Sequence, residues 1–259
     1  MTEDTPSPHR SYPAETFREI YKWDIEHNPG GIFGKLYLRR WSVSIIRILA
    51  PLPVAPNHLT YGSLLASVAA LVVLYKNFPM SHLVGAAFIQ LCLVLGYADG
   101  DMVRLKHLGN RFGGWLDGVI DMMKINVVYF AVAAAAYADT GDAIIFLPLS
   151  AVISTRLVLA HIARKTHDTF ANQDEDVDSV ASGGMVRRWA ERLGIKPEFA
   201  SFSDDVKFFL LTIVVLLQCY MIGLIAFAAL HTLLIAIAFV NVWRKGRREA
   251  LANIGFAEH

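Results

Sequence analysis

Residues 208–243, FFLLTIVVLLQCYMIGLIAFAALHTLLIAIAFVNVW, are 36 residues without a single aspartate, glutamate, lysine or arginine. One helix of this length would extend about 54 Å, whereas the hydrocarbon core of a bilayer is only about 30 Å thick. Two spans joined by a turn near Gly223 fit this stretch better. The chain is therefore predicted to be an all-α integral membrane protein.

Composition and the other apolar runs agree with this prediction. Of the 259 residues, 54% are hydrophobic and 18% are charged, against roughly 25% charged in soluble domains. Apolar runs predict six transmembrane helices at residues 58–75, 82–98, 113–137, 143–163, 207–222 and 224–243. The expected organisation is a polar segment 1–34, an amphipathic helix 35–50, a six-helix membrane domain 51–245 with a loop 164–206, and a tail 246–259.

The basic residues give the predicted orientation. Of 24 lysines and arginines, only Lys76 lies on the outer side of the six-span arrangement, while Lys124 and Arg156 lie within spans. This asymmetry places both termini and the loop 164–206 in the cytoplasm. We expect a bacterial inner-membrane protein in contact with membrane lipids, and no nucleic-acid partner.

The stretch 35–50 has helical spacing of basic and apolar groups. Its arginines flank one apolar face, which consists of Leu36, Trp41, Ile45 and Ile48; the arginines are Arg39, Arg40 and Arg47. This pattern is typical of a helix lying in the cytoplasmic interface. A short seventh span is the weaker alternative, because three arginines would have to be buried.

Three carboxylates gather around the second and third predicted spans. Asp117 and Asp121 are four residues apart, and Gly113 is four before Asp117, so on a helix they form one stripe. Gly113 would leave room for a ligand at the top of that stripe. Asp99 ends the preceding span, and Gly100 beside it permits close approach. Acids facing a membrane interior are costly and are normally kept for a task.

These residue types indicate a metal and a phosphate. Oxygen ligands at this spacing suit Mg²⁺ or Mn²⁺, and Arg104 could hold a phosphate by a bidentate contact. The alternative is simple ion pairing of the carboxylates with Lys106, Arg111 or Lys124. For three acids on facing helices, we favour the metal site.

The pattern resembles the signature of the CDP-alcohol phosphotransferases, Asp-x-x-Asp-Gly-x-x-Ala-Arg, eight or nine residues, then Gly-x-x-x-Asp-x-x-x-Asp. The matching residues are Asp99, Gly100, Arg104, Gly113, Asp117 and Asp121. The stretch Pro56-Asn57-His58-Leu59-Thr60 also looks like that family's Pro-Asn-x-x-Thr motif. Six spans preceded by an interfacial helix are likewise the family's architecture.

The resemblance implies a reaction in which an alcohol attacks the phosphorus of a CDP-linked donor and displaces CMP. Asp121 would accept the proton of the attacking hydroxyl, and the three carboxylates would hold Mg²⁺ or Mn²⁺. The nucleotide would lie against Gly100, Arg104, Gly113, Asn57 and Thr60. The implied donor is CDP-diacylglycerol or a CDP-polyol, the acceptor an alcohol such as a polyol phosphate, and the assembly a homodimer.

Two positions depart from the signature. Val103 stands where alanine is usual, and Gly96 stands where the first signature aspartate, a ligand of the paired metals in that family, is expected. Asp101 is a conceivable substitute for that aspartate: on a helix it would point away from Asp99, whereas irregular backbone at residue 101 would remove this objection. An alternative function is therefore a catalytically impaired member that binds nucleotide or lipid as a scaffold. A prenyltransferase would need a second aspartate-rich motif, and a transporter would need broken helices in two matching halves; neither is present.

The acceptor side is less clearly marked. Arg156 lies within a predicted span, where a cation should meet either a carboxylate or a substrate phosphate. Arg164 and Lys165 follow at the cytoplasmic end, so the three could hold an acceptor or lipid phosphate. His231, in the last span, is predicted to be a hydrogen-bonded structural residue.

Overall fold

A computed structural model describes residues 12–27, 33–170 and 203–256, and all the regular elements in these ranges are helical. The all-α prediction is thus confirmed for the described residues. The chain divides into two compact units, Met1–Asp142 with Ser203–Tyr220, and Ala143–Phe202 with Met221–His259.

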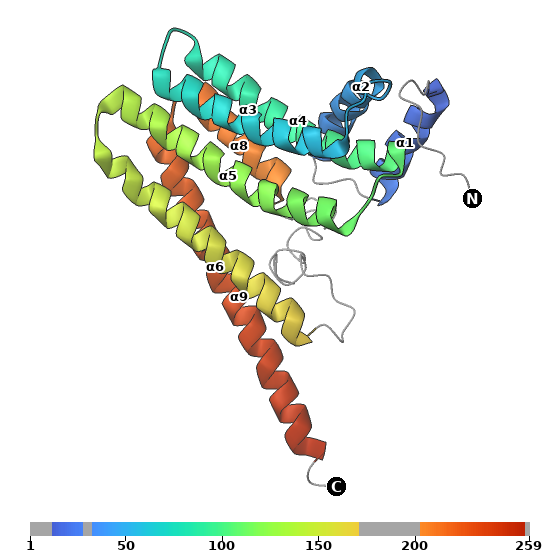
Figure 1. Cartoon of the computed structure of the whole chain (residues 1–259). Coiled ribbons are helices and arrows are strands. Elements are labelled where there is room, and N and C mark those ends of the chain that lie inside the picture. Colours follow the sequence, from blue (N-terminus) through green and yellow to red (C-terminus); the bar gives the residue numbers. More distant parts are fainter. Residues whose placement is uncertain (1–11, 28–32, 171–202, 257–259) are drawn as a thin grey trace, which may run out of the picture. The chain divides into compact units, whose positions relative to one another are not determined.

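The first unit holds most of the helices. They are α1 (Ala14–His27), the π-helical turn η1 (Gly34–Leu38), α2 (Arg39–Leu49), α3 (Pro56–Lys76), α4 (Ser81–Lys106), α5 (Arg111–Thr140) and α8 (Asp204–Leu216). Helix α3 packs against both α4 and α5, and α4 also packs against α2 and α8 (Figure 1). The second unit contains the 3₁₀ turn η2 (Ala143–Ile145), α6 (Phe146–Phe170) and all but the first residue of α9 (Tyr220–Phe256).

Five helical segments of the described chain are long and apolar enough to cross a membrane: α3, α4, α5, Ala143–Ile162 and Tyr220–Arg244. The predicted span 207–222 corresponds instead to α8, whose 13 residues extend only about 20 Å. The chain is an integral membrane protein by this measure, but the predicted count of six spans is not confirmed.

The predicted turn near Gly223 is wrong. Helix α8 ends at Leu216 and α9 begins at Tyr220, so the break lies before Gly223, which is inside α9. Gln218 provides the break by adopting a left-handed backbone with φ of 54°. A turn therefore forms here without glycine, the residue that adopts a left-handed backbone most readily.

The amphipathic segment 35–50 is helical, beginning with η1 and continuing as α2. Three residues of its predicted apolar face, Leu36, Trp41 and Ile48, are exposed, whereas the fourth, Ile45, packs against the buried core. Arg39 is buried, however, so its predicted place beside the exposed face is wrong. Carboxylates from α1 and α4 surround its guanidinium, which makes burial of the charge tolerable.

The predicted loop and tails hold more helix than expected. The polar segment 1–34 contains α1, whose Phe17 packs into a core with residues of α2, α3 and α4. Helix α6 continues to Phe170, into the predicted loop 164–206, and α9 continues to Phe256, into the predicted tail. The acidic run 174–178 lies outside the described residues.

Candidate functional site

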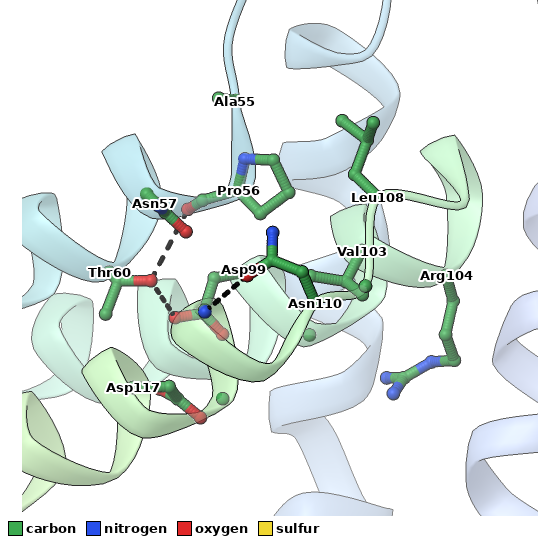
Figure 2. A pocket seen from close by; sticks show the side chains of 14 residues that line it. Ala55, Pro56, Asn57, Thr60, Asp99, Val103, Arg104, Leu108, Asn110 and Asp117 are labelled. Atoms are coloured by element: carbon green, nitrogen blue, oxygen red, sulfur yellow. Dashed lines mark hydrogen bonds between the residues drawn. The ribbon is translucent and has the colours of Figure 1, made fainter.

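A pocket of about 420 Å³ lies where α3 begins, α4 ends and α5 begins (Figure 2). Local sequence brings these three helix ends together. Pro56 starts α3 as its first residue, and its fixed φ suits that position. His107 ends α4 with a left-handed backbone, and the Asn110 side chain caps α5 by accepting a hydrogen bond from the Gly113 amide at 2.7 Å.

Most of the predicted site residues line this pocket. They are Asn57, Thr60, Asp99, Gly100, Arg104, Gly113 and Asp117; the other lining residues are Ala55, Pro56, Val103, Leu108, Gly109, Asn110 and Gly114. The predicted base, Asp121, is not among them, although it lies one helical turn from Asp117.

Asp99 and Asp117 form the acidic side of the pocket. Asp99 is buried and accepts a hydrogen bond from the Thr60 hydroxyl at 2.7 Å. The Asp117 carboxyl group is its direct neighbour, and Figure 2 shows both side chains on facing turns of α4 and α5. Thr60 thus orients Asp99 toward the acid of the next helix.

Glycine lets polar side chains approach the start of α5. A Cβ atom at Gly113 would lie 3.4 Å from Asn110 Oδ1 and 3.7 Å from Asn57 Oδ1. The predicted role of Asn57 at this pocket therefore has a geometric basis, since its amide comes from the first turn of α3. A ligand group entering here would meet side-chain amides and the backbone of α5.

Arg104 lies at the edge of the pocket but is already engaged. Its Nη2 atom is 2.7 Å from Asp24 Oδ1 and 2.5 Å from Asp101 Oδ1. Arg39 Nη1 is 2.7 Å from the same Asp101 oxygen, and Ser42 donates a hydrogen bond to the other. We call Asp24, Arg39, Ser42, Asp101 and Arg104 the polar cluster; it joins α1, α2 and α4.

The contacts of the polar cluster show which way the Asp101 side chain points. This carboxylate is fully buried among two arginines and a serine, so it points away from Asp99 as predicted. It does not replace the acid that is missing at Gly96. It holds the helices outside the membrane spans to the end of α4 instead.

Asp24 is the unusual member of the polar cluster. Its pKa is raised from 3.8 to about 7, chiefly by burial and also by the hydrogen bond to Asp101 and the negative charge of Asp101, while the charges of Arg39 and Arg104 lower it. Half of the Asp24 population would therefore carry a proton near neutral pH.

Asp121 pairs with Lys124 on the next turn of α5. The Lys124 side chain is buried, and its ammonium also interacts with Asp99. A Cβ atom built at Gly96 would touch Lys124 Nζ, so the ammonium occupies the space beside α4 that a side chain at position 96 would need. The predicted alternative of ion pairing with Lys124 is confirmed for Asp121.

The described residues contain no group of three or more histidine, cysteine, aspartate or glutamate side chains arranged to hold a metal ion. Two of the predicted ligands still suit one cation. Asp99 and Asp117 are adjacent, and Asp117 Oδ1 is buried without a hydrogen-bond partner in the described structure. Mg²⁺ is commonly bound by one or two carboxylates together with water and substrate phosphates.

The predicted acceptor residues lie on α6, in the second unit. Arg156 is buried, whereas Arg164 and Lys165 are exposed. Their role toward an acceptor stays a prediction. His231 on α9 is buried with its Nδ1 2.8 Å from the Phe227 carbonyl oxygen, which confirms the predicted structural role.

Two contributors were missed from the sequence. Asn110 precedes the run that begins α5 and could have been identified as its cap. Asp24 carried no usable signal, because its partners lie in α2 and α4 and only the tertiary fold brings them together.

Comparison with known proteins bears on this geometry. No family model matches the chain. Over 99 residues, 38% of this chain and 55% of the relative, it is 24% identical to a CDP-diacylglycerol–glycerol-3-phosphate 3-phosphatidyltransferase of Rickettsia bellii (strain RML369-C). The resemblance to the CDP-alcohol phosphotransferases is confirmed. The chain spans about half the length of this relative, which by its description is a phosphatidyltransferase that uses CDP-diacylglycerol and glycerol 3-phosphate.

Proposed function

We propose that the protein is a membrane phosphotransferase that moves a substituted phosphate from a CDP-linked donor to an alcohol, with release of CMP. The observation that carries this proposal is the pocket, in which Asn57, Thr60, Asp99, Gly113 and Asp117 converge from three helix ends. A pocket of about 420 Å³ is within the usual range for a small-molecule site.

The donor and acceptor are proposed from the relative. Its description names CDP-diacylglycerol and glycerol 3-phosphate, so we propose the same lipid donor and a polyol phosphate as acceptor. A lipid donor fits a pocket at the ends of apolar helices, because the acyl chains could remain in the bilayer. We further propose a homodimer in a bacterial inner membrane with both termini in the cytoplasm.

The chain's own residues would divide the work. Asp99, fixed by Thr60, and Asp117 would hold Mg²⁺ or Mn²⁺, which when bound supplies positive charge to the donor pyrophosphate. The Gly100 and Gly113 backbones leave room for the nucleotide, and Arg104 places a guanidinium at its rim. Asp121, one turn below Asp117 and half-exposed, would accept the proton of the acceptor hydroxyl.

The test is CMP release by purified protein with Mg²⁺ or Mn²⁺, CDP-diacylglycerol and glycerol 3-phosphate, followed by a panel of CDP-alcohols and polyols. Asp121→Asn should lower the rate about 10²- to 10⁴-fold, as loss of a general base does. Asp142→Asn, beyond the opposite end of α5, is the matched control and should be unchanged.

Gly96 favours one competing function, an impaired member that binds nucleotide or lipid without turnover. That function predicts saturable binding of CDP-alcohols, no CMP release from any donor, and identical behaviour of the Asp121→Asn variant. This combination of results would overturn the phosphotransferase proposal.

A further inference from the structure

Four charged side chains lie together between α4 and α5. Asp99, Asp117 and Asp121 are the carboxylates, and Lys124 is the one cation among them. We call the three carboxylates together with Lys124 the acidic cluster. With every group ionised their formal charges sum to −2, so a single divalent cation would neutralise them.

The position of Lys124 is specific. Its side chain is only 7% exposed, and its Nζ pairs with Asp121. Burying an ammonium in a membrane helix is expensive unless carboxylates compensate it. The lysine is therefore tied to the acidic cluster, because no lipid-facing or aqueous position would give it the same partners.

Gly96 makes room for this ammonium. A side chain at position 96 would begin in contact with Lys124 Nζ, and any carboxylate carried there would have to displace it. Glycine at 96 and lysine at 124 thus form one arrangement, in which a fixed positive charge stands where a further acid could otherwise recruit a metal.

We propose that Lys124 is a built-in cation which takes the place of a second metal ion, so that the site holds one divalent cation rather than two. This inference rests on the proposed function in one respect, the assignment of Asp99 and Asp117 as metal ligands. It goes beyond that function by assigning a charge-supplying residue and a metal stoichiometry.

The consequence for the reaction concerns charge alone. Asp121 pairs with the ammonium, while a cation held by Asp99 and Asp117 would face the pocket. Lys124 acts through Asp121 and is thus a positioning residue. Its removal should change how tightly a cation binds and, together with an acid at position 96, how many cations bind, which a merely structural lysine would not do.

The experiment measures Mn²⁺ binding to the full-length protein in detergent micelles, by electron paramagnetic resonance of free Mn²⁺ and by calorimetry, without donor or acceptor. The wild type should bind one Mn²⁺ per chain. Lys124→Met changes the formal charge of the acidic cluster from −2 to −3, so this variant should bind Mn²⁺ at least about tenfold more tightly. The double variant Gly96→Asp with Lys124→Met should bind two.

Lys207→Met is the matched control. Lys207 also pairs with an aspartate three residues earlier, Asp204 on α8, but lies away from the acidic cluster; its variant should bind one Mn²⁺ with wild-type affinity. Circular dichroism and gel filtration check that each variant folds. If Lys124→Met does not fold, the Gly96→Ala variant, whose added methyl group would overlap Lys124 Nζ, should displace the ammonium and tighten Mn²⁺ binding.

The proposal is overturned if the wild type binds two Mn²⁺ or none, or if Lys124→Met and Gly96→Ala both leave stoichiometry and affinity unchanged. Because binding is measured without substrate, its failure is distinct from that of the proposed function. One bound Mn²⁺ without CMP release would contradict only the proposed phosphotransferase function. Two bound Mn²⁺ with CMP release would contradict only the proposal that Lys124 replaces a second metal ion.

Discussion

Thr60 fixes the orientation of the Asp99 carboxylate through one hydroxyl group. The hydrogen bond of 2.7 Å supports a buried carboxylate, and bonds to charged groups contribute about 1.5–3 kcal/mol. Residues of this kind were largely predictable from spacing: the motif placed Asp99, Gly113 and Asp117 in one pocket. The motif did not show that Arg104 is shared with Asp24, because motif spacing describes neighbours in sequence only.

Thr60→Val keeps the shape of the side chain and removes the hydroxyl. We expect kcat/KM for CMP release to fall about tenfold or more, corresponding to about 1.4 kcal/mol of lost stabilisation, with weaker Mn²⁺ binding. Ser67→Ala is the control, since the Ser67 hydroxyl donates only to the Leu64 carbonyl of its own helix. Equal activity of Thr60→Val and wild type would show that Asp99 needs no such support.

At the scale of elements, α1 is held to the membrane helices by charge as well as by its apolar residues. Phe17 enters the core shared with α2, α3 and α4, while Asp24 joins the polar cluster. The sequence predicted the long apolar helices, since their runs are unambiguous. It did not predict α1, whose stability comes from tertiary contacts rather than from its own composition.

The docking of α1 should depend on pH. The pKa of Asp24 is about 7 in the folded protein, against 3.8 as its ordinary value. Between these values the folded state binds more protons than the unfolded state, so stability falls as pH rises from about 4 to 7 and then levels off.

The wild type should therefore melt about 5–10 °C lower at pH 8 than at pH 5 through this group, because a carboxyl group that titrates near pH 7 when folded loses about 2–3 kcal/mol of stabilisation over this interval. Thermal unfolding of wild type and Asp24→Asn at both pH values isolates the contribution, because other titrating groups are common to both. An identical pH dependence in the two proteins would contradict the assignment.

At the scale of the whole molecule, segregated charge is the feature that the sequence conveys best. It identified an integral membrane protein, but hydropathy alone counted α8 as a full span. A 13-residue helix is too short to cross about 30 Å of hydrocarbon by itself. Hydropathy alone therefore does not locate the helix ends where a left-handed residue such as Gln218 interrupts an apolar run.

The orientation of the protein in the membrane can be tested at the two ends of α5, whose 30 residues separate Leu108 from Asp142. With the pocket in the cytoplasm, Asp142→Cys should react with a membrane-impermeant maleimide in intact cells. Leu108→Cys should react only after the membrane is permeabilised. The parent protein should carry Cys219→Ser, since Cys92 is buried but Cys219 is partly exposed. The reverse labelling pattern would place the pocket outside.

The polar cluster also sets an order of events during synthesis. Asp24 leaves the ribosome well before its partners on α4, and at roughly 5–20 residues per second Arg104 follows about 4–16 s later. Throughout that interval α1 lacks the Arg104 guanidinium, one of the two that compensate its buried acid. Helix α1 should therefore remain in water and complete its docking only after α4 has been synthesised.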